Sequence, residues 1–343
     1  MNKLNSILAI SLFAITFTAC KKDDEPVIIV PPSDGSTLTL EGKTAVSPYA
    51  NIVFADLSKD KQTPVDRKSW NIALTSDAKF RVLLNAAYQT TAVATSKTDI
   101  NAVTLADPGT AVNINHDIMD ATTATLVDSW DGDITKTAFA EVGAVEADNK
   151  VYLVSFEGNK DKDKWIKVKI SRTANGYKLQ HARLGETAIK TLEIAKNADF
   201  NLVFVSLENN KAVDVEPKKA DWDLSWSYGT SNSGLGSPYW FQDYVAINDL
   251  AGTQAAEVLT TATLTYASFV EANVASLTFL KTRDAIGSKW RVTTGTGIKA
   301  DRFYVVKDAS GNVYKLKFVS MGVGSDGGER GRPVIEYKLI KKG

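Results

Sequence analysis

An ordered internal repeat constrains this 343-residue chain more than any other feature of its sequence. A W-N-I-A-L segment begins at Trp70, and a similar W-D-L-S-W segment begins at Trp222. Each is followed 82 residues later by a tyrosine-led apolar run, at Tyr152 and at Tyr304. Segments that recur in one order at one spacing indicate a duplicated structural unit. We therefore expect two tandem modules, spanning residues 38–194 and 195–343.

The pattern within each module is that of short β-strands. Apolar and polar residues alternate over runs rich in Val, Thr, Leu, Tyr and Trp, as in residues 51–57 and 202–207. This period of two is typical of strands with one buried face. Asn175-Gly176 between two such runs predicts a hairpin. Helical spacing is weak and limited to residues 264–280, so we expect an all-β fold of mainly antiparallel hairpins with few short helices.

Composition excludes several classes of function. The 40 basic and 40 acidic residues give a formal net charge of zero, and no basic stripe suggests a nucleic-acid partner. The single cysteine, Cys20, excludes an intramolecular disulfide, and only two histidines are present, His116 and His181. This shortage excludes a zinc site built from His and Cys and argues against a Ser-His-Asp hydrolase. With no catalytic motif visible, we expect a protein that is not an enzyme.

The N-terminus has the features of an export signal. Lys3 precedes a nearly continuous apolar run over residues 4–18, which is too short for a comfortable membrane span. The run ends in F-T-A-C, which resembles a bacterial lipobox with Cys20 as the lipid-modified residue; the alternative is an ordinary signal peptide. The following K-K-D-D-E is similar to the surface-export signal of Bacteroidota lipoproteins. We predict a lipoprotein signal peptide over residues 1–19, a tether over residues 20–37, and an outer-membrane lipoprotein exposed at the cell surface.

The repeated segments resemble the HmuY-like lipoproteins of Bacteroidota. The opening pattern of that family is matched by Asp56-Leu57-Ser58, by Trp70 to Ala73, and by Arg81 and Asn85. Its closing hairpin, with a D-x-x-G-N turn, is matched over residues 303–318. The resemblance implies an all-β, hand-like fold of long hairpins. It also implies haem as a cofactor, clamped in a cleft by two axial His or Met ligands, captured at the surface and passed to an outer-membrane transporter.

The family's axial ligands are not matched in this sequence. Where a histidine would follow Trp290, the chain has Thr294 and Gly295, and neither residue type ligates haem iron well. The second module lacks histidine, and its one methionine, Met321, follows the closing strand instead of preceding it.

His116 and Met119 are the remaining candidate haem-iron ligands. Residues three apart share one face of a helical turn, so this pair would need a flexible loop or a site with a single ligand. The alternative is a surface loop with an incidental methionine. His181 alternates with Tyr177 and Leu179 on a predicted strand, which favours a partly buried structural residue over a ligand.

A second candidate site is an aromatic stretch around the glycine- and serine-rich residues 229–238. The three consecutive aromatics at residues 239–241 cannot all face one side of a strand, so at least one should face outward or line a cleft. Such side chains suit a planar apolar ligand, a sugar face or a protein partner; alternatively, the loop folds back and buries them. The candidate ligand-binding residues are Trp226, Tyr228, Tyr239, Trp240, Phe241 and Tyr244.

Two further features have structural interpretations. Trp70 and Trp222 each begin a half-buried strand pattern, so we interpret both as core residues. Asp128, Asp131 and Asp133 lack the twelve-residue pattern of a calcium-binding loop, which favours a solvated turn over a calcium site.

The sequence therefore predicts a surface-anchored ligand-binding lipoprotein. Haem capture for delivery to an outer-membrane transporter is implied by the resemblance. The rival hypothesis is a non-haem accessory or adhesin-like lipoprotein that binds a glycan or a protein partner through the aromatics of residues 226–244. The outer membrane would be contacted through the lipid anchor, and no nucleic acid is expected.

Overall fold

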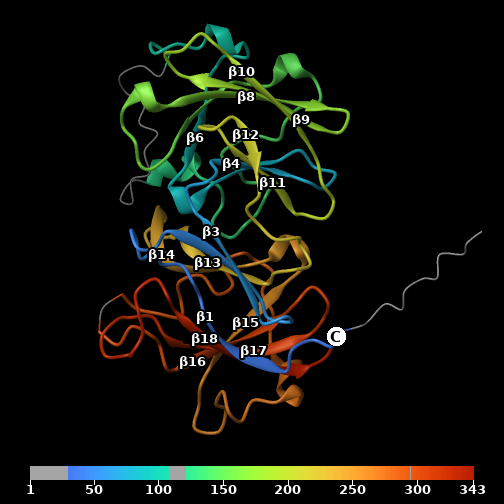
Figure 1. Cartoon of the computed structure of the whole chain (residues 1–343), viewed down its shortest axis with the longest axis vertical. Coiled ribbons are helices and arrows are strands. Elements are labelled where there is room, and N and C mark those ends of the chain that lie inside the picture. The colour runs from blue at the N-terminus through green and yellow to red at the C-terminus, as the bar shows by residue number, and fades with distance from the viewer. Residues whose placement is uncertain (1–29, 108–120, 294) are drawn as a thin grey trace, which may run out of the picture. The chain divides into compact units, whose positions relative to one another are not determined.

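The structure is a computed structural model that describes residues 30–107, 121–293 and 295–343. Within these ranges the chain forms eighteen β-strands and seven short 3₁₀ helices, coloured along the chain in Figure 1. The longest of these helices have six residues, and no described helix is long and apolar enough to cross a membrane. The expected all-β fold with few short helices is confirmed.

The strands are β1 (Gly35–Thr39), β2 (Asn51–Asp56), β3 (Lys61–Asp66), β4 (Ile72–Thr75), β5 (Val82–Leu84), β6 (Thr91–Ala94), β7 (Tyr152–Ser155), β8 (Ile166–Thr173), β9 (Gly176–Arg183), β10 (Lys190–Ala195), β11 (Leu202–Ser206), β12 (Lys211–Val213), β13 (Leu224–Asn232), β14 (Pro238–Ile247), β15 (Gln254–Leu259), β16 (Arg302–Lys307), β17 (Val313–Ser320) and β18 (Val334–Lys341). The 3₁₀ helices are η1 (Ala86–Tyr88), η2 (Ile100–Ala102), η3 (Ala121–Leu126), η4 (Glu146–Asp148), η5 (Lys162–Lys164), η6 (Asp249–Ala251) and η7 (Glu271–Ser276).

These strands form two kinds of antiparallel sheet, each present twice. The β9 sheet has the order β10-β9-β8-β7-β6, and the β17 sheet has the matching order β1-β18-β17-β16-β15. The β4 sheet has the order β12-β11-β4-β5, and the β2 sheet has the order β14-β13-β2-β3. The paired orders show that the repeated sequence segments form repeated architecture.

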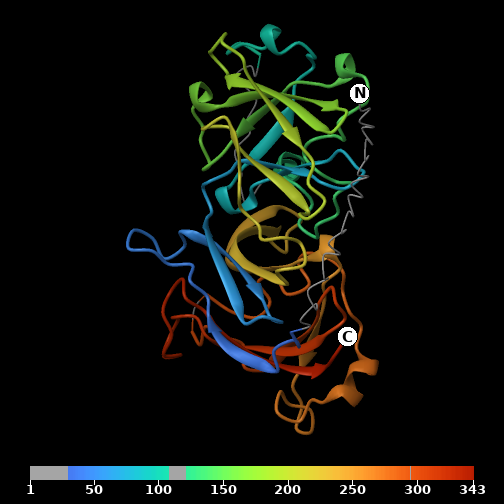
Figure 2. The same ribbon diagram turned by 45° about the vertical axis from the view of Figure 1, so that its right-hand side comes forward.

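Strands of the two repeats are exchanged between the sheets. β2 pairs with β13, β4 pairs with β11, and β1 lies beside β18. Figure 2 shows blue β2 and β3 next to gold strands from the second repeat. The expected boundary between residues 194 and 195 lies inside β10 and does not separate the sheets, and contacts unite residues 32–343 into one compact unit. In addition, β1 begins at Gly35, within the segment expected to be a tether.

The repeated motifs account for this exchange, because each motif bonds to the other repeat. The backbone N–H of Leu57 donates to the Asp223 carboxyl group at 2.8 Å. The equivalent N–H of Leu207 donates to Oδ1 of Asn71, also at 2.8 Å. Asn71 and Asp223 directly follow the two repeated tryptophans, and both side chains are buried. The position after the tryptophan thus supplies an acceptor for a backbone donor of the other repeat.

A buried asparagine closes each repeat's motif in the same way. Nδ2 of Asn85 donates to the carbonyl of Trp70 at 2.8 Å, and Nδ2 of Asn248 donates to the carbonyl of Trp222 at 2.9 Å. The side-chain oxygens of the two asparagines cap η1 and η6. Asn85 and Asn248 are therefore equivalent, and each fixes the backbone of the tryptophan that begins its motif.

β2 is buried on both faces because it lies between two apolar cores. Val53 and Ala55 belong to the core shared with the β17 sheet. Ile52 and Phe54, on the opposite face, belong to a central core shared with the β4 sheet. β4 has the same two-sided burial, between the central core and the core of the β9 sheet. Side chains of consecutive strand residues alternate between the faces, which explains these nearly continuous apolar runs.

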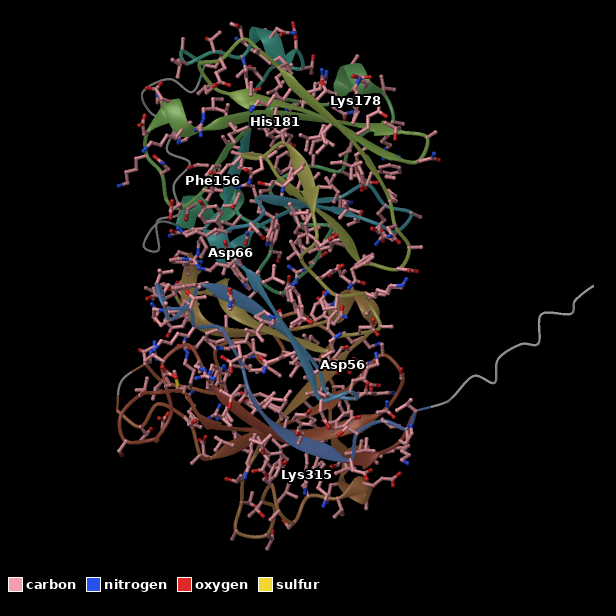
Figure 3. All side chains as sticks on the ribbon, viewed as in Figure 1. Asp56, Asp66, Phe156, Lys178, His181 and Lys315 are labelled. Atoms are coloured by element: carbon pink, nitrogen blue, oxygen red, sulfur yellow. The ribbon has the colours of Figure 1, made fainter. Side chains whose placement is uncertain are left out.

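A buried lysine in each closing hairpin anchors the long loop that precedes it. Nζ of Lys167 donates to the carbonyl of Val103 at 2.9 Å. Nζ of Lys315, labelled in Figure 3, donates to the carbonyl of Phe269 at 2.9 Å. Burial lowers the pKa of both amino groups. These two lysines of the alternating closing strands therefore bind backbone carbonyls and are not offered to solvent.

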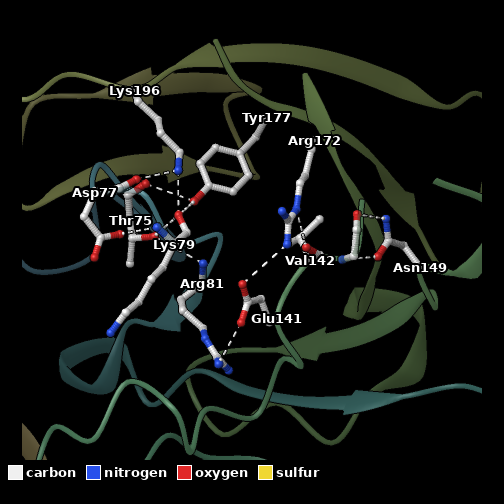
Figure 4. Close-up of polar contacts among 11 residues, drawn as sticks. Thr75, Asp77, Lys79, Arg81, Glu141, Val142, Asn149, Arg172, Tyr177 and Lys196 are labelled. Atoms are coloured by element: carbon white, nitrogen blue, oxygen red, sulfur yellow. Dashed lines mark hydrogen bonds and ion pairs between the residues drawn. The ribbon is translucent and has the colours of Figure 1, made fainter. Parts of the chain in front are cut away.

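A polar cluster ties the β4 sheet to the β9 sheet, as Figure 4 shows. The hydroxyl group of Tyr177 on β9 donates to the carbonyl of Thr75 on β4 at 2.9 Å. Glu141 lies between Arg81 and Arg172, with nitrogen–oxygen distances of 2.8 and 3.4 Å. Because these ion pairs are partly exposed, each is worth about 0–1 kcal/mol, and the buried tyrosine is the more specific tie.

Two turns form where the sequence predicts them. The hairpin predicted at Asn175-Gly176 forms between β8 and β9, with Gly176 as the first residue of β9. The closing D-x-x-G-N turn is held by the Asp308 carboxylate, which accepts hydrogen bonds from N–H and Nδ2 of Asn312 at 2.8 and 2.7 Å. Gly311 has a φ of 91°, which favours glycine at that position. Residues 264–280 contain only the short helix η7.

The buried acid that receives the Leu57 N–H predicts a pH-dependent stability. Burial raises the pKa of Asp223 to about 8, with the nearby Asp56 and Asp308 adding to the shift. The folded protein thus binds this proton more tightly than the unfolded chain. This contribution to stability is complete below about pH 4 and is lost as the pH rises towards 8. The variant Asp223→Asn, which restores the amide found at the equivalent Asn71, should lose less stability over this range, by roughly 2 kcal/mol or more.

Urea unfolding of both proteins at pH 5 and pH 8 measures this difference. The matched control is Asp221→Asn, because Asp221 is partly exposed and pairs with Lys59 at the surface. Equal pH slopes for Asp223→Asn and the unchanged protein would contradict the prediction.

Candidate functional site

A partly open cavity of about 170 Å³ lies between the β2 sheet and the β4 sheet. Its walls come from β2, β5, β11, β13 and β14, together with the turns around η1 and η6. Equivalent residues of the two repeats line it from both sides. The equivalent pairs are Ile52 and Leu202, Phe54 and Phe204, Trp70 and Trp222, and Asn85 and Asn248.

Strand alternation on β13 leaves space for the cavity. Leu224 and Trp226 point into the core of the β17 sheet, so Ser225 and Ser227 point the opposite way and line the cavity. Small side chains on this face leave room that large apolar residues would fill. The fourth residue of the first repeated motif, Ala73, is equally small and also faces the central core.

Gly229 on β13 keeps one wall of the cavity open. A Cβ atom at this position would meet ring atoms of Tyr244 at 2.4 and 2.6 Å, which is closer than real contacts allow. Both residues line the cavity. The packing of Tyr244 against the bare backbone therefore depends on glycine at residue 229.

Two aromatic pairs join the repeats at the cavity wall. Trp70 meets Phe204 edge to face, with ring centroids 4.8 Å apart. Trp222 meets Phe54 in the same manner at 5.0 Å. Each pair joins a tryptophan of one repeat to a phenylalanine of the other, and such pairs add about 0.5–1.5 kcal/mol beyond area burial. The interpretation of Trp70 and Trp222 as core residues is confirmed, since they are 8 % and 9 % exposed.

Four polar side-chain atoms of residues that line the cavity are buried and have no hydrogen-bond partner among the described residues. They are Nε1 of Trp70, Nε1 of Trp222, Oγ1 of Thr90 and Oγ of Ser227. Leaving a buried donor unpaired costs about 1–3 kcal/mol. The indole N–H of Trp226 is also unpaired, but it belongs to a separate void of about 10 Å³, which has room for about one water molecule.

Three carboxyl groups and one guanidinium group lie at the polar part of the wall. Asp128 accepts hydrogen bonds from the N–H of Leu84 at 2.6 Å and of Ala138 at 3.0 Å. Burial raises the pKa of Asp128 to about 6.

Glu216 accepts the N–H of Leu202 at 2.9 Å, and burial raises its pKa to about 7. Asp249 pairs with Arg283 at 3.5 Å, and burial also raises the pKa of Asp249. Each carboxyl group is thus committed to backbone donors or to the arginine.

The predicted aromatic stretch is divided between core, cavity and surface. Trp226 is 1 % exposed and belongs to the core of the β17 sheet. Tyr228 and Tyr244 line the cavity. Half of the expected loop, residues 229–238, is strand, because β13 extends to Asn232 and β14 begins at Pro238.

The three consecutive aromatics lie along β14. Trp240 stacks on Tyr228 with ring centroids 3.9 Å apart, and its Nε1 donates to the carbonyl of Ala86 at 2.8 Å. Phe241 is half-buried and meets Tyr239 edge to face at 4.5 Å. Tyr239 is the most exposed of the three, at 36 %.

Neither of the candidate iron ligands that the structure describes, His181 and Met321, lines the cavity. His116 and Met119 lie outside the described residues, as does Cys20. His181, labelled in Figure 3, is buried on β9, where Nε2 bonds to Oδ1 of Asn210 at 2.8 Å. Met321 is fully buried in the core of the β17 sheet.

The three acidic residues Asp128, Asp131 and Asp133 do not share one environment, and the sequence does not indicate this difference. Asp131 accepts the Ser129 hydroxyl at 2.6 Å, and Asp133 accepts the Thr135 hydroxyl at 2.6 Å, so both bond within the turn. Asp128 instead lines the cavity. Among the described residues, no group of three or more His, Cys, Asp or Glu side chains could hold a metal ion.

Comparison with known protein families matches residues 198–337 to the HmuY protein family. The match covers less than half of the chain and the second of the two repeats. It contains β11 to β17 and the first half of β18, but it excludes the strands that the first repeat supplies to the same sheets. No curated protein and no solved structure gives a significant match to the chain.

The sequence reasoning missed most of the cavity residues. The sequence identifies Trp70 and Trp222 as equivalent residues of the two repeats. This equivalence is the one signal in the sequence that both line the same cavity. Glu216 and Arg283 carry no such signal, because neither lies in a repeated segment. Their proximity to the tryptophans depends on the exchange of strands.

The close contact at Gly229 predicts that Gly229→Ala destabilises the protein. The added methyl group must push the Tyr244 ring towards the cavity, and overpacking of this kind costs about 1–3 kcal/mol. Urea unfolding measures the change in the free energy of unfolding. The control is Gly185→Ala, whose Cβ would meet only the flexible end of the Leu105 side chain, at 3.3 Å. Equal effects of the two substitutions would contradict the packing role of Gly229.

Proposed function

We propose that this protein is a surface-anchored lipoprotein that captures a hydrophobic small molecule and is not an enzyme. The cavity between the β2 and β4 sheets is the observation that carries this proposal. A concave, largely apolar space with a few placed polar groups is the usual form of a small-molecule site. The carboxyl groups around it accept backbone hydrogen bonds or pair with Arg283, which are structural roles.

Haem, or a related tetrapyrrole, is the cargo that the HmuY match favours. On this proposal the protein takes up haem at the cell surface and passes it to an outer-membrane transporter. Its partners are then the outer membrane, through the lipid on Cys20, and that transporter.

The described cavity does not fit haem as an iron site. Haem iron takes His, Cys, Met or Tyr as protein ligands, and the described lining contains only Tyr228 and Tyr244 from this set. Burial raises the pKa of Tyr244, which disfavours the phenolate form that binds iron. The candidate iron ligands on this proposal are therefore His116 and Met119.

Haem titration followed by visible absorbance tests the cargo. With protein lacking residues 1–20, we expect a sharp Soret band that saturates at about one or two equivalents, because a specific iron ligand gives a defined spectrum. The variant His116→Ala should lose the sharp band, and Met119→Ala should shift it.

The matched control is His181→Gln, because His181 is buried on β9 and bonded to Asn210. This variant should keep the band. A broad band that never saturates would overturn haem as cargo. It would favour the rival site on β13 and β14, where Leu235 in the connecting turn is 73 % exposed and Tyr239 is 36 % exposed.

Lipid anchoring is tested by Cys20→Ser in cells. The substitution removes the thiol that carries the lipid, so the protein should move from the outer-membrane fraction to the soluble fraction. Proteinase K added to intact cells should degrade the unchanged protein if it is displayed at the surface. Unchanged membrane fractionation of Cys20→Ser would overturn the anchor, and protection in intact cells would overturn surface display.

A further inference from the structure

The strands divide into two lobes that do not follow the two repeats. The β4 and β9 sheets contain β4 to β12 and no other described strand, so they come from the single stretch 70–215. We call this stretch the continuous lobe. The β2 and β17 sheets contain β1 to β3 and β13 to β18, which lie within residues 35–66 and 222–343. These two stretches form the split lobe, and segments 67–69 and 216–221 connect it to the continuous lobe.

Each lobe has an apolar core of its own. The core of the β9 sheet takes its buried residues only from residues 72–207. The core of the β17 sheet takes them only from residues 40–57 and 224–337. Every ring pair among the described residues also lies within one lobe. Because a separate core is what allows a domain to fold by itself, each lobe has the make-up of a folding unit.

Few polar contacts cross the boundary between the lobes. Between described residues, no strand pairing and no ion pair joins one lobe directly to the other. Single hydrogen bonds do cross. Nε1 of Trp240 donates to the carbonyl of Ala86 at 2.8 Å, and the N–H of Arg283 donates to the carbonyl of Asp131 at 2.8 Å.

The cavity lies on this boundary. Its lining includes Trp70, Ala87 and Phe204 of the continuous lobe, and Ile52 and Trp222 of the split lobe. The same five residues belong to the central core, which is the apolar core that the lobes share. Unfilled space forfeits van der Waals contacts between its walls. The lobes are therefore held to each other less firmly than the strands within each lobe are.

We propose that the protein is a two-lobed clamp, whose lobes fold as separate units and part at the cavity by bending at residues 67–69 and 216–221. Hinges of this kind are a few loop residues between rigid bodies that close around a ligand. Arg67 lies in the first hinge and donates to the carbonyls of Tyr49 and Ala87, one in each lobe. A ligand enters while the lobes are apart and is then held between them. This last step rests on the proposed ligand-binding function, whereas the parting of the lobes does not.

Two matched core substitutions test whether the lobes are separate folding units. Val168 on β8 and Leu316 on β17 pair with the equivalent residues Tyr152 and Tyr304, and both are fully buried. In native-state hydrogen exchange of protein lacking residues 1–20, Val168→Ala should accelerate exchange on β11 and β12 about tenfold or more and leave β2 and β3 unchanged. Leu316→Ala should do the reverse.

Two other outcomes of this exchange experiment would overturn the proposal. If the repeats were the folding units, Val168→Ala would accelerate β2 and β3 and spare β11 and β12. If residues 32–343 unfolded only as a whole, either substitution would accelerate all of these strands equally.

Hydrogens whose bonds cross the boundary report directly on the parting of the lobes. These are the N–H of Arg283 and the Nε1–H of Trp240. Both should exchange faster than the strand amides of either lobe and with the same dependence on urea, because one motion breaks both bonds. The controls are the Nε1–H groups of Trp165 and Trp290, which donate within their own lobes. Exchange of the two reporters only together with the strand amides, or with unequal urea dependence, would overturn the clamp.

A substitution at the boundary should make the lobes part more often. Trp240→Phe keeps an aromatic ring and removes one crossing hydrogen bond, so exchange at the N–H of Arg283 should accelerate about fivefold. Trp165→Phe removes an indole bond within the continuous lobe and should leave that rate unchanged. Equal effects of the two substitutions would contradict the clamp.

The clamp and the haem proposal fail separately. Should Trp240→Phe fail to fold, exchange in the unchanged protein still decides whether the lobes part. A haem titration that never saturates would overturn haem as cargo and would leave the exchange results as they are.

Discussion

Two hydrogen bonds from backbone N–H groups to buried side chains join the two repeats of this structure. The N–H of Leu57 reaches Asp223, and the N–H of Leu207 reaches Asn71. Each bond joins the end of one repeat's strand to the residue that follows the other repeat's tryptophan. Because the acceptors are buried, an unpaired partner would cost about 1–3 kcal/mol, and this cost favours the exchanged arrangement over loosely attached modules.

The exchange also explains why the equivalent acceptors can be an amide in one repeat and an acid in the other. Burial raises the pKa of Asp223 to about 8, so at neutral pH the group is mostly an uncharged acid. An uncharged carboxyl group accepts a backbone N–H much as the amide of Asn71 does. Asn71 in the first repeat and Asp223 in the second thus meet the same requirement, which is an uncharged acceptor for a backbone N–H.

The same exchange creates the cavity. It brings the small side chains of β13 opposite the aromatic pairs that link the repeats. As a result, Trp70 and Trp222 line the same cavity. The HmuY match over residues 198–337 relates the second repeat to a family associated with haem. The described lining of the cavity contains no His, Cys or Met, so the match to this family and the cavity are independent observations.

Several elements could be predicted from the sequence because they depend on neighbours in the chain. Alternation identified the strands around Trp70 and Trp222, and the D-x-x-G-N turn at Asp308 is a local hydrogen-bond pattern. The duplication was visible in spacing alone. The sequence could not identify the partner of each strand. The alternation of apolar residues in β2 is compatible with pairing to any apolar strand.

The sequence by itself determined an all-β chain with two related motifs, and it marked Trp70 and Trp222 as buried. Only the tertiary structure decided that β2 pairs with β13 and β4 with β11. It also decided that Asp128, Glu216 and Arg283 meet beside those tryptophans. The physical reason is that strand periodicity records which face of a strand is buried, whereas pairing and cavity formation depend on contacts between residues far apart in the sequence.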